Sequence, residues 1–350
     1  MMMETQKAAQ APDYRLDGPR GREVAGRGLV SAEWHRCTVD RRLMKQLMQR
    51  DDRKGLMWLG PWVLLLGLAG ALAWAALGTA WAVPAFLLYG ILYSVSDHAA
   101  HELSHGTPLR TPWLNRIFDR LASFMTLHEP VYWRWSHARH HTDTLIVGRD
   151  REIAFPRPFS LRDLLLDVFF LKSGLTEIAR TVAHACGRVD AATRSFVPEH
   201  EIGRMVRSSR GHALAFAAVI GACAVTASLV PLLFVIGPRF YGGQLALVFN
   251  ITQHAGLPED VLDHRLNCRS IRLHPLLGWL YMNMQYHLEH HMFPMVPLHA
   301  LPALHEAIRD QCPPPYRGLA EAYREIVPAV LRQRRDPDHH AARPVPAAMR

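Results

Sequence analysis

A group of histidines near the end of the chain has the spacing of a metal site. His287, His290 and His291 stand at positions i, i+3 and i+4, so in a helix their imidazoles share one face. Pro294 and Pro297 follow closely and would end such a helix. Because imidazole is a common ligand of transition metals, this face predicts a metal site.

Other segments supply histidines at matching spacings. His101 and His105 are one helical turn apart, and His98 precedes them by a further turn. A second cluster, Ser-His-Ala-Arg-His-His, lies in the middle of the chain, and one more histidine ends the last apolar stretch. These side chains are a sufficient ligand supply for two metal ions. The predicted ligands are His101, His105, His137, His140, His141, His254, His287, His290 and His291.

The segment from His101 to His105 also fits a different enzyme. It reads HELSH, the HExxH pattern in which two histidines hold zinc and Glu102 acts as the general base of a protease. An intramembrane zinc protease is therefore an alternative. A single zinc site uses about three protein ligands, which would leave the other histidine clusters without a role.

Two long apolar blocks must position these histidines. No Lys or Arg occurs between residues 55 and 109, and the stretch from 211 to 258 contains Arg239 alone. Each block is long enough for two passes of about 20 residues. The sequence therefore predicts an all-α integral membrane protein with two hairpins, the second turning at Gly237-Pro238-Arg239. The predicted transmembrane helices lie near 57–78, 85–103, 213–236 and 240–255.

The flanking sequence predicts the domain boundaries and the orientation. Residues 1–54 are expected to form a partly disordered arm, 55–320 the membrane domain with a helical cap around the metals, and 321–350 a tail, disordered after about 332. Basic residues concentrate at the open ends of the hairpins. Both termini and the metal site are therefore expected on the cytosolic side, as in a bacterial inner-membrane protein.

The charge and the cysteines exclude other classes of function. The net charge of +9 is spread over segments that also carry acids and contain no nucleic-acid motif, so we expect contact with anionic lipid and no nucleic acid. The five cysteines are scattered and encode no disulfide framework. A metal transporter or sensor is a further alternative, but transporters place ionisable residues near the membrane midplane, where these blocks carry almost none.

The histidine clusters resemble those of a known family. HELSH, HARHH and HLEHH are similar to the three histidine boxes of the membrane fatty acid desaturase and hydroxylase superfamily, a likeness that covers roughly residues 85–320. The last box with its flank, YHLEHHMFPMVPLHALPALHEAI, is a specific match. HHTDTLIVGRDREI and NITQHAGLPEDVLDHR are similar to the rhizopine-oxygenase-like branch, whose proposed reaction removes an O-methyl group from a methylated inositol amine.

This resemblance implies two iron ions that use O2 to oxidise an unactivated C–H bond of an acyl, lipid or related small substrate. Desaturation, hydroxylation and O-demethylation all stay open, because they depend on how one substrate carbon is placed. The superfamily also implies further ligands from the last apolar helix, which map onto His254 and Asn250. His98 is an additional candidate from the first box.

Electrons must come from another protein, because the chain carries no ferredoxin, flavin or haem motif. The resemblance implies a Rieske-type or other ferredoxin with its reductase, and we expect it to dock by charge on Arg134, Arg139 and Arg151. Beside the ligands, carboxylates are expected to orient the imidazoles, namely Asp97, Glu102 and Glu289. The other histidines are expected to be structural or solvated, namely His128, His184, His200, His264, His274, His299 and His305.

Overall fold

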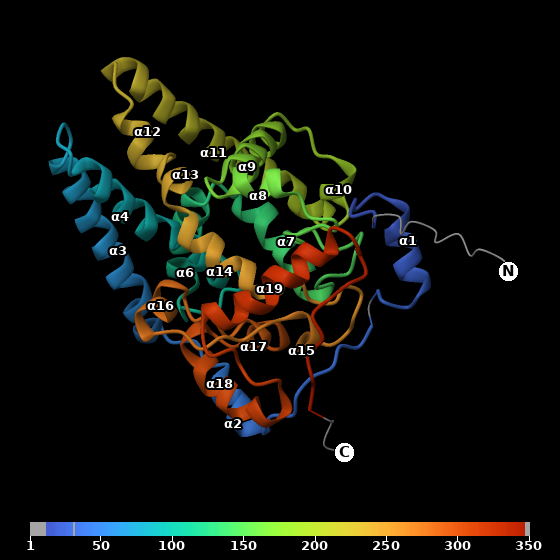
Figure 1. The fold of residues 1–350 in the computed structure, drawn as a ribbon. Helices are drawn as coiled ribbons and strands as arrows, with labels where there is room; N and C mark the ends of the chain where they lie inside the picture. The colour runs from blue at the N-terminus through green and yellow to red at the C-terminus, as the bar shows by residue number, and fades with distance from the viewer. Residues whose placement is uncertain (1–11, 31, 347–350) are drawn as a thin grey trace.

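The computed structural model describes residues 12–30 and 32–346. Within these ranges the regular secondary structure is helical, apart from two isolated β-bridges that pair Ser270 with Tyr286 and Ile271 with Tyr316. Long apolar helices project from a cap of shorter helices (Figure 1). The predicted all-α fold class is confirmed.

The first apolar block forms a hairpin that continues into the cap. Its helices are α3, Asp52–Ala75, α4, Ala82–Ser94, and α5, Ser96–Ser104. α4 packs against α3, where the buried Trp62 indole donates a hydrogen bond of 2.8 Å to the Leu92 carbonyl. α5 follows α4 directly and carries His101, with His105 as its C-cap residue, beyond the apolar part of the hairpin.

The second apolar block turns at a different place from the predicted one. Its helices are α11, Glu199–Thr226, α12, Val230–Val235, α13, Pro238–Gly242, and α14, Gln244–His254. Ala227, with a left-handed φ of 47°, ends α11, so the chain reverses at residues 227–229. The prediction of a turn at Gly237-Pro238-Arg239 was wrong, because proline also suits the first turn of a helix and Pro238 begins α13.

The two blocks cross closely at a pair of glycines. A Cβ on Gly242 of α13 would lie 2.0 Å from the backbone carbon of Gly90 on α4, so this crossing leaves no room for a side chain. Beside it, the Tyr89 hydroxyl donates to the Phe234 carbonyl at 2.9 Å. That bond satisfies a carbonyl in the last turn of α12 and ties the second block to the first.

Two helices of the described chain, α3 and α11, are long and apolar enough to cross a membrane. Many of their apolar side chains face outward: Leu64, Leu68 and Trp74 on α3, and Leu214 and Val225 on α11, are more than half exposed. A core helix of a soluble protein would bury such residues, whereas lipid accepts them at no cost. These helices are therefore candidate membrane spans.

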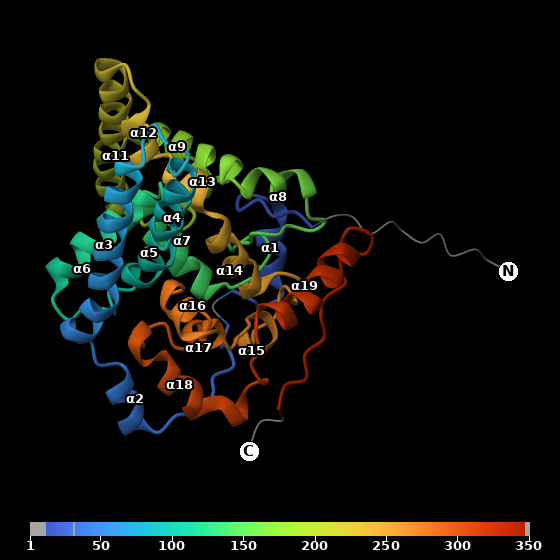
Figure 2. The ribbon, with the colours of Figure 1, turned by 60° about the vertical axis from the view of Figure 1, so that its left-hand side comes forward.

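The remaining helices are shorter, and most gather at the end of the long helices opposite the hairpin tips (Figure 2). Before the second block they are α1, Pro19–Gly26, α2, Arg41–Leu47, α6, Pro112–Met125, α7, Pro130–Thr142, α8, Leu161–Asp167, α9, Leu171–Ala185, and α10, Ala191–Arg194. After it they are α15, His264–Asn267, α16, Pro275–Leu280, α17, His287–Met292, η1, Leu298–Ala300, α18, Leu301–Ile308, η2, Arg309–Gln311, and α19, Leu319–Gln333.

Both terminal segments contact the loop that follows α14. The Tyr14 hydroxyl donates to the Glu259 carboxylate at 2.9 Å. From the other end of the chain, the Ala341 N–H donates to the Gly256 carbonyl at 2.9 Å. The segments that the sequence assigns to an arm and a tail therefore pack beside the end of α14, which carries His254.

Candidate metal centre

Four helices bring the nine predicted histidines together. α7 begins where the Glu129 carboxylate accepts the N–H groups of Val131 and Tyr132, so its start is fixed next to Pro130. On α7 and α17, the spacing i, i+3, i+4 turns each histidine box toward the same space. The histidines are His101 from α5 and His105 from its C-cap, His137, His140 and His141 from α7, His254 from α14, and His287, His290 and His291 from α17.

Five of these imidazoles form one group, here called site 1. Its members, each offering a nitrogen within 4.8 Å of the others, are His101, His105, His137, His141 and His290. The Nε2 atoms of His101 and His290 lie 2.9 Å apart, and His137 Nε2 lies 3.1 Å from the Nε2 atoms of both His105 and His141. Three helices thus direct Nε2 atoms at one small volume.

The other four imidazoles form site 2, which adjoins site 1. Its members are His140, His254, His287 and His291. His287 Nε2 lies 2.9 Å from His254 Nε2 and 3.0 Å from His291 Nε2. The rings of His141 and His291 stack across the boundary, with centroids 4.3 Å apart. Neighbouring histidines on α7, and again on α17, therefore serve different sites.

Hydrogen bonds at the far ring nitrogen determine how the site 2 imidazoles present Nε2. His254 Nδ1 donates to the Asn267 carbonyl oxygen at 2.7 Å, since a carbonyl can only accept. His140 Nδ1 donates to the Asp150 carboxylate at 2.8 Å. The Thr144 hydroxyl gives its proton to the His140 carbonyl and so accepts from Nδ1 of His291 at 3.1 Å.

These partners place the proton on Nδ1 and the lone pair on Nε2 in three of the four imidazoles. Lone pairs that face one another at this range repel unless a cation lies between them. A set of neutral imidazole nitrogens is a donor set for a transition metal. Although burial lowers the pKa of His140, the charge and hydrogen bond of Asp150 outweigh it and raise that pKa, which makes this imidazole a stronger donor. Site 2 therefore fits a metal ion.

At site 1, Glu152 contacts a ligand imidazole in the way that Asp150 does at site 2. Its carboxylate lies 3.0 Å from His137 Nδ1 and accepts the Ser136 hydroxyl at 2.8 Å. Burial and the charges of neighbouring imidazoles hold the pKa of His141 and the pKa of His290 well below the ordinary histidine value. Both rings are neutral at pH 7 and keep a lone pair for a metal.

One of the three predicted carboxylates contacts a site imidazole. Glu102 is fully buried, and its carboxylate lies 3.2 Å from His290 Nδ1 without the alignment of a hydrogen bond. Glu289 turns away from site 2, accepts the Ser270 hydroxyl at 2.6 Å and pairs with His305. Neighbours along a helix point in different directions, so adjacency in sequence did not identify the group that faces each ring.

Asp97 takes part in a different buried network. Its carboxylate pairs with Arg239 at 3.1 Å and accepts the Asn250 amide at 2.7 Å. The Asn250 Oδ1 lies 3.2 Å from His98 Nε2, so His98 and Asn250 bond to each other and belong to neither histidine group. These three predicted residues line the space beside the metal sites and not the sites themselves.

Asp150, Glu152 and Thr144 were not predicted to act at the site. They follow the second histidine box in the stretch HHTDTLIVGRDREI, so the available signal was two acids and a threonine shortly after the box. His264 is also closer than predicted, because its ring and the Cys268 thiol offer ligand atoms within 4.8 Å of the His291 nitrogen.

A cavity of about 470 Å³ reaches both metal sites. We call it the mixed-charge cavity, because five acidic and five basic side chains line it. It lies among α5, α7, α9 and α14, and the site histidines in its wall are His101, His140 and His254. The charged residues are Asp97, Glu152, Asp167, Glu177, Glu259, Arg151, Arg157, Lys172, Arg180 and Arg239.

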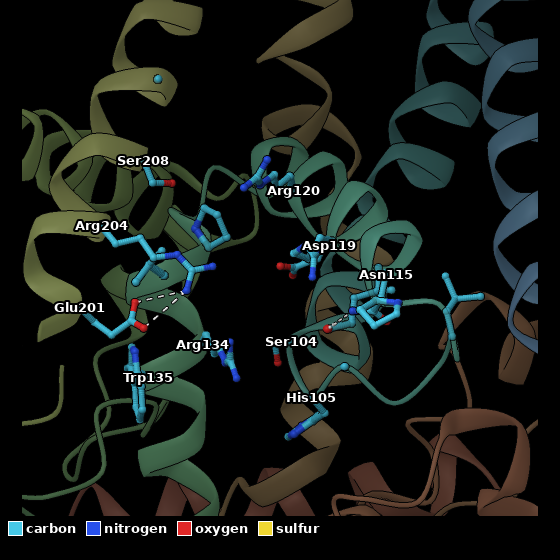
Figure 3. Close-up of a pocket in the computed structure, with 18 of the residues that line it drawn as sticks. Ser104, His105, Asn115, Asp119, Arg120, Arg134, Trp135, Glu201, Arg204 and Ser208 are labelled. Atoms are coloured by element: carbon cyan, nitrogen blue, oxygen red, sulfur yellow. Dashed lines mark hydrogen bonds and ion pairs between the residues drawn. The ribbon is translucent and has the colours of Figure 1, made fainter. Parts of the chain in front are cut away.

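A second cavity, of about 740 Å³, reaches site 1 at His105. We call it the basic cavity, because six arginines line it together with two carboxylates, Asp119 and Glu201. Figure 3 shows Arg134 and Asp119 on facing helices, with Glu201 paired to Arg204 at 3.4 Å. The arginines are Arg50, Arg116, Arg120, Arg134, Arg204 and Arg207.

Comparison with known proteins agrees with this geometry. The fatty acid desaturase family model matches residues 78–323, well over half of the 350 residues, and the match contains all nine histidines. No curated protein matches the chain. With two histidine groups able to hold metal ions and two candidate membrane spans, the chain belongs to the fatty acid desaturase family and is an oxidoreductase of that family.

Proposed function

We propose that sites 1 and 2 each hold one iron ion and that the protein uses O2 and external electrons to oxidise an unactivated C–H bond. The observation that carries this proposal is the division of nine imidazoles into adjoining groups of five and four. The iron pair would supply the oxygen activation and the electron transfer, for which imidazole ligands are suited.

The chain itself holds the ligand rings in place. Asp150, Glu152, Thr144 and the Asn267 carbonyl each fix the Nδ1 side of one imidazole, which keeps that ring from turning away. Six of the nine histidines are buried, which limits the access of water to this part of the site; they are His101, His137, His140, His287, His290 and His291. No catalytic side chain is proposed beyond the metal ligands.

Two reactions are candidates within this function. One is desaturation or hydroxylation of a lipid or acyl chain, the chemistry for which the family is named. The other is oxidative O-demethylation, supported by the similarity of HHTDTLIVGRDREI to the rhizopine-oxygenase-like branch. In that case hydroxylation of a methoxy carbon gives a product that breaks down to an alcohol and formaldehyde.

The zinc protease receives less support. His101 and His105 share site 1 with three further imidazoles, whereas a catalytic zinc keeps an open position. Glu102 lies beside Nδ1 of His290, on the side of the ring away from the Nε2 atoms. That position does not suit a base that must activate metal-bound water.

We propose four membrane passes with the metal sites on the cytosolic side. α3 and α11 would each make one pass, α4 another, and the broken run α12 to α14 the fourth, ending at His254. Lys54 lies at the cap end of α3, and Arg207 and Arg210 lie in the polar first part of α11. Basic residues at these ends favour the cytosolic side.

We propose that an acidic ferredoxin, of Rieske or other type, docks over the basic cavity. Of the three arginines first considered, Arg134 lines this cavity and is exposed. Arg139 instead donates to the Ser195 carbonyl at 2.8 Å, and Arg151 donates to the Tyr132 hydroxyl at 3.1 Å. An excess of arginine beside His105 would steer an acidic partner to the ligand of site 1 that this cavity reaches.

Metal analysis of the detergent-purified protein tests the proposal. We expect two iron ions per chain and little zinc, and we expect the exposed control variant His200→Ala to keep both ions. One zinc per chain, together with loss of peptidase activity in Glu102→Gln, would show that the protease alternative is correct.

A further inference from the structure

Two cysteines from distant parts of the chain meet in the cap. Cys37 lies in the segment between α1 and α2, and Cys312 follows η2, 275 positions later. Both side chains are buried, and their Sγ atoms lie 3.6 Å apart. The sulfur atoms of a disulfide are about 2.05 Å apart, so these two would have to approach by about 1.5 Å to form one. The pair is therefore close to the geometry of a cross-link.

The residues next to the two cysteines hold their backbones side by side. The Thr38 N–H donates to Gln311 Oε1 at 2.8 Å, and the Gln311 side-chain amide donates to the Thr38 carbonyl at 2.9 Å. The Cys37 N–H donates to Met292 Sδ at 3.1 Å, which fixes the same segment to the end of α17. These hydrogen bonds lie within one residue of each thiol, so the two sulfur atoms face each other whenever the segments are docked.

The surroundings favour Cys37 as the thiol that reacts first. Arg265, which also pairs with Asp263 at 2.8 Å, donates to the Gln311 carbonyl at 3.1 Å and so lies next to the pair. The hydrogen bond from the Cys312 thiol lowers the pKa of Cys37 against the effect of burial, and the charge of Arg265 lowers it further. Because the thiolate is the reactive form of cysteine, Cys37 is the better nucleophile of the two.

We propose that Cys37 and Cys312 are a reversible redox pair, which hydrogen peroxide joins as a disulfide that fastens the N-terminal segment to the cap. The Cys37 sulfur attacks peroxide, breaks the O–O bond and becomes a sulfenic acid, with release of one water. The Cys312 sulfur then attacks the Cys37 sulfur, and the remaining oxygen leaves as a second water. The two thiols lose two protons and two electrons, which reduce one peroxide to two waters. A dithiol reverses the reaction by exchange.

The segment that this bond would fasten lies beside the histidine boxes. The Trp34 ring stacks on the ring of His264, with centroids 4.3 Å apart, and the His264 ring lies 5.3 Å from that of His291. The Trp34 indole also donates to the Thr142 carbonyl at the end of α7, at 3.1 Å. A cross-link at Cys37 would therefore keep a covering of the second and third boxes in place. The inference does not rest on the proposed function, because peroxide can be supplied from solution.

Peptide mapping of the full-length, detergent-purified protein tests the pair. The folded protein is treated with hydrogen peroxide, its remaining thiols are alkylated, and it is digested with trypsin. We expect peptide 37–41, CTVDR, to be joined to peptide 310–317, DQCPPPYR, and dithiothreitol to release both. The exposed Cys186 is the internal control for access of the oxidant. Oxidation of Cys186 without joined peptides would overturn the inference, as would joined peptides that form only after unfolding in urea.

The unfolding temperature provides a second readout, with matched variants. A cross-link that closes a long loop restricts the unfolded chain, so peroxide should raise this temperature by about 5 °C. Cys37→Ser and Cys312→Ser each remove one partner and should abolish the rise, whereas Cys186→Ser should keep it. An equal rise in Cys37→Ser would contradict the proposal. If a variant failed to fold, the mapping of the unaltered chain would still decide whether the bond forms.

Discussion

The two cavities that reach the metal sites differ in the balance of charge on their walls. The basic cavity gathers six arginines around two carboxylates and meets the sites at His105. The mixed-charge cavity balances five acids with five bases and meets three site histidines. α7 lines both, with Arg134 and Trp135 on one side and Trp133 and His140 on the other.

Because of this difference in charge, the basic cavity can attract a partner from a distance, whereas the mixed-charge cavity acts only on a molecule in contact with it. An excess of one charge creates a field that reaches into solvent and steers a partner of opposite charge. Paired charges cancel beyond a few ångströms and act through hydrogen bonds on a molecule that is already bound. The proposed function, which includes an external electron donor, needs both, and the helix that holds the second histidine box separates the two cavities.

The largest effect is expected from removing one ligand at each site. His105→Ala removes the ligand beside the basic cavity, and His254→Ala removes one beside the mixed-charge cavity. Each loss opens the coordination of one ion, so we expect each variant to retain about one iron per chain and to lose activity at least about 1,000-fold.

Iron analysis and O2 consumption check this prediction, with the exposed His200→Ala as the control. The assignment of ligands to two sites would be contradicted if either variant kept two irons, or if both lost all iron in parallel with a collapse of the fold.

A smaller effect is expected at Glu152, which belongs to the mixed-charge cavity and holds His137 of site 1. Glu152→Gln keeps an acceptor but removes the charge that polarises the ring, so iron affinity should fall about 10- to 100-fold. Competition with an iron chelator measures this affinity. Glu199→Gln, at an exposed carboxylate on the first turn of α11, should have no effect. Equal affinity in both variants would show that Glu152 does not support the metal.

The sequence predicted which histidines cluster but not their division between two groups. Each histidine box lies within five residues, where helical spacing alone shows that the rings share a face. Whether His140 joins His141 or His254 depends on how α7 crosses α14 and α17, and local spacing carries no such information. Asp150 and Glu152 reach the rings only because the loop after α7 folds back on the helix.

The place of Arg239 in the fold also could not be predicted from local sequence. In the sequence it is the one charge in a long apolar block beside Gly-Pro, which favours a solvated hairpin tip. In the structure it is buried and pairs with Asp97, because α11 turns earlier and brings α13 against α4. A charge isolated in an apolar block indicated a buried partner in this chain, and its partner was too distant in sequence to be identified.

A more moderate effect is expected from charge removal in the basic cavity. Arg134→Gln should raise the KM for an acidic ferredoxin about 3- to 10-fold at low salt, and the difference should shrink as ionic strength increases. Lys172→Gln makes the same charge change in the mixed-charge cavity and should leave this KM unchanged. Steady-state rates over a salt series measure both. If the two variants behaved alike, the donor would not distinguish the two cavities.

The smallest effect concerns the pH dependence of the basic cavity. Burial raises the pKa of Asp119 to about 6, although Arg134 and the Ser123 hydroxyl favour its charged form. Below pH 6 this carboxyl is neutral and the cavity has its full positive charge. As the pH rises through 6, Asp119 ionises and cancels part of that charge, so the KM for an acidic ferredoxin should rise about twofold between pH 5 and 7.

Asp119→Asn keeps the side chain neutral at every pH and should hold the KM at its low-pH value. Measuring KM for both proteins across this range, with turnover by a small-molecule reductant as the control, separates the titration of Asp119 from that of the donor. A rise that persists in Asp119→Asn would assign the effect to another group and remove Asp119 from the docking surface.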